Sequence, residues 1–202
     1  TADWDHDLDL AGRRIGVIGT GATSVQLLPE LAPVADHLTV FQRQPNFSIP
    51  ARNMPMTTEY ANFWKDDYPA KRQEMRYMPN GVLREVNDKS ALEVSEEERQ
   101  ATYETRWEAG TGAFLGAFND ILLNKDANDT MAEFVRGKIR QTVKDPVTAE
   151  ALCPKTHPIG TKRICIDNGY YQTFNRDNVA LVDISETPIE RLTEAGLSVG
   201  DS

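Results

Sequence analysis

A glycine-rich turn between a short apolar run and a helical pattern is the feature that most constrains this chain. Residues 14–19 are apolar and rich in β-branched side chains, as in a buried parallel strand. The glycine turn follows, and then a segment with apolar side chains at helical spacing, which Pro29 is expected to kink and Pro33 to end. Residues 38–41 supply a second apolar run. Strand, turn, helix and strand within about 30 residues predict a βαβ unit.

The turn has the chemistry of a dinucleotide site. It reads G-x-G-x-x-S; Gly19 permits a tight turn and Gly21 leaves space for a pyrophosphate to approach the backbone. The helix beyond offers free N–H groups and the positive end of its dipole. The motif follows a strand and opens a helix, which favours a nucleotide site over the alternative, an ordinary glycine turn. We therefore predict an α/β, Rossmann-like fold with a parallel sheet, whose cofactor-binding turn consists of Gly19, Thr20, Gly21, Ala22, Thr23 and Ser24.

The end of the second strand indicates which dinucleotide binds. NAD sites place Asp or Glu about 20 residues beyond the glycines, whereas NADP sites avoid that acid and supply arginine. Here Arg43 and Gln44 follow the strand, and no acid does. Arg43 can bind a phosphate through two hydrogen bonds, so the sequence favours NADP(H), although a surface arginine is the alternative. Lys162-Arg163, in a loop with glycine and proline, is a second basic pair, for which a solvated pair is the plain alternative.

Composition excludes several partners. With 22 basic and 31 acidic residues the net charge is −9, so the surface repels nucleic acid and anionic membranes. No apolar run approaches the ~20 residues of a membrane helix. Cys153 and Cys165 lack zinc-ligand spacing, and the three histidines stand apart, so we expect no metal site. The sequence contains no G-x-S-x-G elbow, so it gives no support for a hydrolase. Because two cysteines cannot form a disulfide framework, we expect a reduced, cytoplasmic environment.

The chain is expected to divide into a cofactor-binding domain, residues 10–47 and 154–202, and a helical insertion, residues 48–153. Prolines mark the exit from the first part, and residues 162–166 and 179–184 return to strand-like sequence.

Local signals predict helices within the insertion. Ser95 begins a capping box for a helix through Trp107, and Asp145-Pro146 is typical of a helix start. Residues 114–122 and 131–139 keep helical spacing, whereas the two glycines of residues 110–116 have no preceding strand and predict a turn between helices.

Taken together, the motifs resemble the nicotinamide-cofactor half of the Baeyer–Villiger monooxygenases, over essentially the whole chain. The segments that carry the resemblance are the tail of the family fingerprint at Thr1-Ala2-Asp3-Trp4-Asp5, the glycine turn with Gln26, F-Q-R-x-P at residues 41–45, G-x-K-R at 160–163, and Y-Y-x-x-F-N-R-D-N-V at 170–179. The family's first glycine motif, for FAD, would precede residue 1, and the return to the FAD domain would follow Ser202. The chain is thus expected to be a fragment from which the FAD domain is absent.

The resemblance implies roles for the basic loop. Lys162 would join Arg43 at the 2′-phosphate of NADP(H), and Arg163 would be catalytic, touching the nicotinamide and the flavin peroxide. The parent enzyme would use NADPH, FAD and O2 to convert a ketone into an ester or lactone. An N- or S-oxygenating flavin monooxygenase is the alternative within the same class, and a dinucleotide-binding module without turnover is the alternative outside it.

Overall fold

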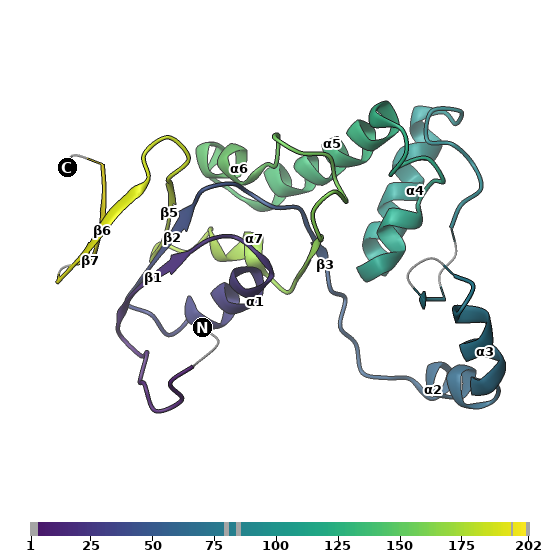
Figure 1. Ribbon diagram of the computed structural model, residues 1–202, viewed down its shortest axis with the longest axis horizontal. Helices are drawn as coiled ribbons and strands as arrows, with labels where there is room; N and C mark the ends of the chain where they lie inside the picture. The colour runs from purple at the N-terminus through teal and green to yellow at the C-terminus, as the bar shows by residue number, and fades with distance from the viewer. Residues whose placement is uncertain (1–3, 79–80, 84–85, 195, 201–202) are drawn as a thin grey trace. The chain divides into compact units, whose positions relative to one another are not determined.

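The computed structural model describes residues 4–78, 81–83, 86–194 and 196–200 (Figure 1). It forms two compact units, one of residues 1–49 with 132–202 and the other of residues 50–131. Each unit is described by itself. Among the described residues, no helix has both the length and the apolar character needed to cross a membrane.

The first unit contains a parallel sheet with the strand order β1-β2-β5. The strands are β1 Arg14–Ile18, β2 His37–Gln42 and β5 Val179–Asp183. In the register, Val17 of β1 pairs with Val40 of β2, and Val40 pairs with Leu181 of β5. The α/β fold with a parallel sheet is therefore confirmed, and the three strands lie within one residue of their predicted positions.

Helix α1, Ala22–Leu31, connects β1 to β2. Its buried side chains include Val25, Leu28 and Leu31, the apolar positions that predicted it. Pro29 lies inside the helix, which ends two residues later and before Pro33. Helix α1 packs against α7, Tyr170–Thr173, and against β4, Cys165–Asp167, which pairs with β3, Ser48–Pro50 (Figure 1).

Helix α6, Pro146–Leu152, is fixed to the end of β2. Asp145 caps it by accepting a hydrogen bond from the Thr148 amide at 2.8 Å, as the sequence predicted. Gln42 is 1% exposed, and its Nε2 donates to the Ala151 carbonyl at 2.7 Å. These contacts group residues 132–153, which include the second half of helix α5, Lys125–Thr142, with the sheet. The expected insertion, 48–153, is longer than the compact unit 50–131, because its last 22 residues belong to the unit that contains the parallel sheet.

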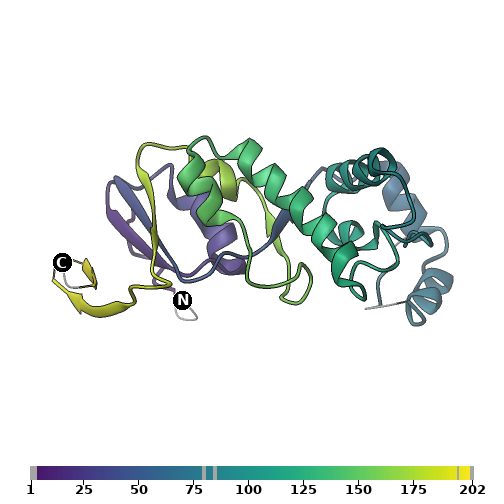
Figure 2. The same ribbon diagram turned by 90° about the horizontal axis from the view of Figure 1, so that it is seen from above.

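An antiparallel hairpin that the sequence did not predict follows β5. Strands β6, Ile189–Thr193, and β7, Gly196–Val199, lie at the side of the sheet away from α5 (Figures 1 and 2). Leu197 approaches Gly16 of β1, where an added Cβ would lie 3.9 Å from its Cδ1.

The second unit is helical, with α2 Thr58–Lys65, α3 Tyr68–Met75, α4 Glu96–Ala109, the 3-10 helix η2 Thr111–Gly116 and the first half of α5. Ser95 caps α4 by accepting from the Glu98 amide at 3.2 Å, as predicted. Gly110 ends α4 at φ +68° and leads directly into η2, so the turn predicted over residues 110–116 is a single residue followed by a 3-10 helix. The prediction of an α-helix over 114–122 is wrong, because the chain bends after η2. The Asp120 carboxylate accepts hydrogen bonds there from the Ser90 hydroxyl and the Ala91 amide.

Candidate cofactor-binding site

The glycine turn lies at the carboxyl end of β1. Gly19 has φ +99°, a backbone conformation that favours glycine, and its N–H donates to the Phe41 carbonyl of β2 at 2.9 Å. Gly21 is the N-cap of α1, and no side chain caps the helix. An added Cβ at Gly21 would meet no atom within 4 Å. The turn thus leaves open space in front of uncapped helix N–H groups, which fits an anion such as a pyrophosphate.

The side chains of the turn divide between the protein interior and solvent. Thr20 and Ser24 are buried, so serine at the third motif position packs in the interior, where glycine or alanine would otherwise stand. Ala22, Thr23 and Gln26 are exposed. The Thr20 hydroxyl donates to the Gln44 carbonyl at 2.6 Å, which links the turn to the segment after β2.

Gln44 joins two segments that are far apart in the sequence. Lys162 donates from Nζ to the Gln44 amide oxygen, and the amide nitrogen of Gln44 donates to the Thr156 hydroxyl. Together with Thr20, these contacts connect the glycine turn, the end of β2 and the loop before β4. The predicted residues Gln44 and Lys162 are therefore in direct contact.

Arg43 lines a cavity of about 500 Å³ beside this network, together with Gln44, Pro45, Glu150, Ala151, Cys153, Lys155, Thr156, Asp183 and Ser185. Its side chain is exposed, and its guanidinium has no hydrogen bond or ion pair within the described part of the chain. An arginine with all its donors free, at the rim of a cavity, can bind a phosphate without first breaking an internal contact.

Arg163 lies next to Lys162 on the exposed side of the same loop. Its backbone carbonyl accepts from Asn46 Nδ2 at 3.3 Å, which holds the loop against the segment after β2. The contacts of the described residues do not join its guanidinium to Arg43 or to the cavity.

Thr156, which lines the cavity, is a site residue that the sequence reasoning missed, and His157 follows it. The His157 ring packs edge-on against Phe47, with ring centroids 5.5 Å apart. Burial lowers the pKa of His157, and the Lys162 charge lowers it further, so the ring is neutral near pH 7. Their place just before G-x-K-R was the available signal.

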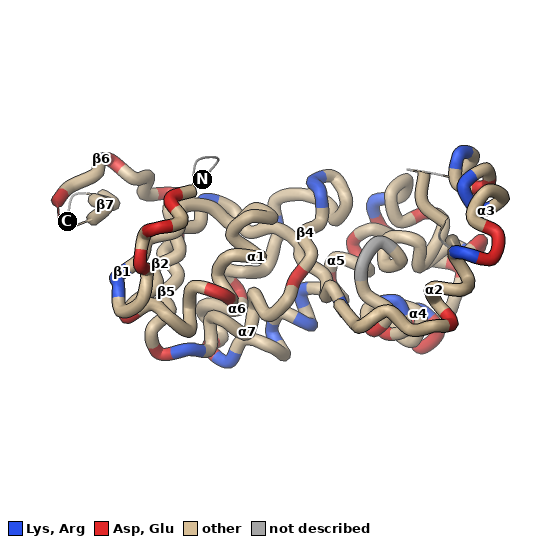
Figure 3. The backbone as a smooth tube through the Cα atoms, turned by 90° about the horizontal axis from the view of Figure 1, so that it is seen from below, with Lys and Arg blue, Asp and Glu red and all other residues tan. Residues whose placement is uncertain are grey.

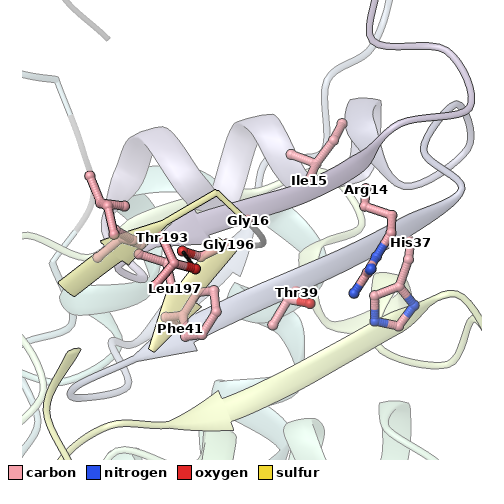
Figure 4. A pocket seen from close by; sticks show the side chains of 11 residues that line it. Arg14, Ile15, Gly16, His37, Thr39, Phe41, Thr193, Gly196 and Leu197 are labelled. Atoms are coloured by element: carbon pink, nitrogen blue, oxygen red, sulfur yellow. Dashed lines mark hydrogen bonds between the residues drawn. The ribbon is translucent and has the colours of Figure 1, made fainter. Parts of the chain in front are cut away.

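A second cavity, of about 480 Å³, lies elsewhere, between β1, β2 and the hairpin. In Figure 4, Phe41 lies beside Leu197 and Thr193, while Arg14 and His37 lie at the other end. None of the predicted site residues lines it, whereas Arg43 and Gln44 line the first cavity. The described residues contain no group of three or more His, Cys, Asp or Glu side chains that could hold a metal ion.

No family model matches the chain. Individual relatives do. The 2-oxo-Δ3-4,5,5-trimethylcyclopentenylacetyl-CoA monooxygenase of Pseudomonas putida is 44% identical over 96% of this chain and 36% of its own length. Cyclohexanone 1,2-monooxygenase of an Acinetobacter species is 41% identical over 98% of this chain and 37% of its own length. The phenazine N-monooxygenase of Lysobacter antibioticus is also 41% identical, over the whole chain and 37% of its own length.

The fold is also similar to that of a solved structure. A steroid monooxygenase bound to NADP superimposes with a TM-score of 0.93 and 48% sequence identity, over all of this chain and 39% of the other. The fold and the sequence are thus similar to a segment of known monooxygenases. More narrowly, a Baeyer–Villiger monooxygenase of Pseudooceanicola batsensis is 38% identical over 98% of this chain, and the chain spans a little more than a third of the length of the relatives that it matches.

Proposed function

We propose that this chain is the NADPH-binding part of an FAD-dependent Baeyer–Villiger monooxygenase, which inserts one oxygen atom from O2 into a ketone to give an ester or lactone. The observation that carries the proposal is the network in which Lys162 contacts Gln44 and Gln44 contacts Thr20, beside Arg43, whose guanidinium has no partner among the described residues. We expect the 2′-phosphate to lie beside this network, and no acid follows β2 to bind a free ribose hydroxyl.

Different residues of the site would bind different groups of the cofactor. Backbone N–H groups of residues 22–24 would hold the pyrophosphate, since Gly21 leaves the space and no side chain caps the helix. Arg43 and Lys162 would hold the 2′-phosphate, and Gln44 would orient the lysine. When bound, NADPH supplies the hydride and FAD activates oxygen. Arg163 would place a permanent positive charge near negative charge that develops on the substrate during oxygen insertion.

FAD would be bound mainly by a domain outside these 202 residues, as the partial coverage of the relatives suggests. We expect the protein to act in the cytoplasm, where the two free, buried cysteines would stay reduced.

Calorimetric titration with NADP+ and NAD+ tests the proposal. A hydrogen bond to a charged group contributes about 1.5–3 kcal/mol, so R43Q should weaken NADP+ binding roughly 10- to 100-fold and leave NAD+ binding nearly unchanged. R13Q is the matched control, because it removes the same charge from an exposed arginine outside the cavity. Equal affinity of the unmodified protein for NADP+ and NAD+ would reject the assignment.

N-oxygenation is the alternative that the sequence left open; one relative is a phenazine N-monooxygenase, but cyclohexanone, cyclopentanone and acetone monooxygenases are also among the relatives, so the alternative is not favoured. The two are distinguished by supplying the protein, together with its FAD-binding part, with a cyclic ketone or an aromatic N-heterocycle. Ester or lactone formation supports the first proposal, and an N-oxide as the only product supports the second.

A further inference from the structure

Lys155 is a basic residue that lines the Arg43 cavity and that no sequence motif singled out. The cavity lining has two cations, Arg43 and Lys155, and two carboxylates, Glu150 and Asp183. Lys155 Nζ lies 2.8 Å from Glu150 Oε2. The lysine is thus in reach of the cavity and is held by a carboxylate that also lines it.

The backbone around Lys155 is fixed relative to the end of β2. Gln42 donates to the Ala151 carbonyl at 2.7 Å, and Arg136 Nη1 donates to the Pro154 carbonyl at 3.4 Å. Arg136 also forms an ion pair with Glu133 at 3.0 Å. Contacts on both sides of the preceding residues therefore keep Lys155 at the wall of the cavity.

Glu150 does not need Lys155 in order to remain neutralised. It also pairs with Arg140, which in turn pairs with Glu133 at 2.7 Å. Figure 3 shows basic and acidic residues interspersed around α5 and α6, where this network lies. Arg140 first and Lys155 second hold the pKa of the Glu150 carboxyl well below its usual range. The Lys155 side chain is 57% exposed, and an ion pair this exposed contributes little to stability.

We infer that Lys155 is a third cation for the 2′-phosphate of the cofactor and so a specificity-determining residue for NADP(H) over NAD(H). In the free protein Glu150 holds the ammonium group; on binding, Lys155 exchanges this carboxylate for the phosphate while Arg140 continues to neutralise Glu150. A flexible lysine with three donors suits such an exchange better than a rigid, doubly hydrogen-bonded arginine. The inference rests on the proposed function, since it concerns the same cofactor.

The test is calorimetric titration of K155M and E150Q with NADP+ and NAD+. K155M should weaken NADP+ binding about 10-fold, since one hydrogen bond to a charged group is lost, and should leave NAD+ binding unchanged. E150Q should tighten NADP+ binding roughly 2- to 5-fold, because it frees Lys155 and removes a negative charge from the cavity lining. K144M is the matched control, because Lys144 is exposed and does not line the cavity.

Opposite effects of K155M and E150Q on NADP+ binding support the inference. If K155M and K144M have the same NADP+ affinity, or if E150Q weakens binding as K155M does, the pair is only structural and the inference is overturned. Thermal unfolding of each variant accompanies the titrations. A failure of the proposed function looks different, because then the unmodified protein itself does not prefer NADP+ over NAD+.

Discussion

Replacing Gly21 by alanine should weaken cofactor binding without impairing folding. Gly21 has φ −81° and ψ −175°, an extended conformation that any residue adopts, and an added Cβ meets no atom within 4 Å. Nothing in the described protein therefore requires glycine at this position. G21A should fold normally with little net change in the free energy of unfolding, because the restriction that alanine places on the unfolded chain is offset by alanine being a poorer N-cap residue than glycine.

The same methyl group should obstruct the cofactor. It would occupy the space in front of the first N–H groups of α1, where the pyrophosphate would lie. Losing one or two hydrogen bonds to a charged group, at about 1.5–3 kcal/mol each, should weaken NADP+ binding at least ~10-fold. NAD+ binding should weaken equally, because both dinucleotides carry the pyrophosphate.

The assay combines urea unfolding with calorimetric titration, and G19A is the contrasting control. Gly19 has φ +99°, so alanine there should cost about 1–2 kcal/mol of stability whether or not cofactor is present. If G21A binds NADP+ as tightly as the unmodified protein, the turn does not hold the pyrophosphate. If G21A is destabilised as much as G19A, the space at Gly21 is not open and the reasoning fails.

Three further predictions concern other parts of the molecule. In the protein with its FAD-binding part, R163A should lower the steady-state rate of product formation about 100- to 1000-fold with little change in NADP+ affinity. An unchanged rate would show that Arg163 is not catalytic. Burial and the Lys162 charge lower the pKa of His157 below its ordinary value of 6.5. As the pH falls, the unfolded chain therefore binds a proton before the folded protein does, so the free energy of unfolding should fall below about pH 6.5. H157Q should reduce this slope in urea unfolding between pH 5 and 7.5, and an identical slope would contradict the lowered pKa of His157. D120N should lower the free energy of unfolding by about 1.5 kcal/mol in the same assay, since the Asp120 carboxylate accepts from Ser90 Oγ at 2.6 Å, and no change would refute this anchoring role.

The sequence predicted the elements whose signals are local. The apolar run before Gly19, the turn and the helical spacing beyond it lie within a few residues of one another, and the strand–turn–helix unit formed as expected. The caps at Ser95 and Asp145 were predictable for the same reason, because a capping side chain bonds to an amide three residues away.

Longer-range features could not be predicted in this way. The contacts of Gln44 with Lys162 and Thr156 join residues more than a hundred positions apart, so no local pattern pointed to them. The spacing over 114–122 favoured an α-helix, yet tertiary contacts of Asp120 and burial of Phe118 stabilise a bent path instead. The β6–β7 hairpin carried no turn signal that the sequence reasoning used.

A crystal structure of this chain with NADP+ tests the central claim most directly. We expect the pyrophosphate to lie against the backbone amides of residues 22–24 and the 2′-phosphate to lie within hydrogen-bond distance of both Arg43 and Lys162. Density for the dinucleotide in the cavity between β1 and the β6–β7 hairpin, or a 2′-phosphate that contacts neither Arg43 nor Lys162, would contradict it.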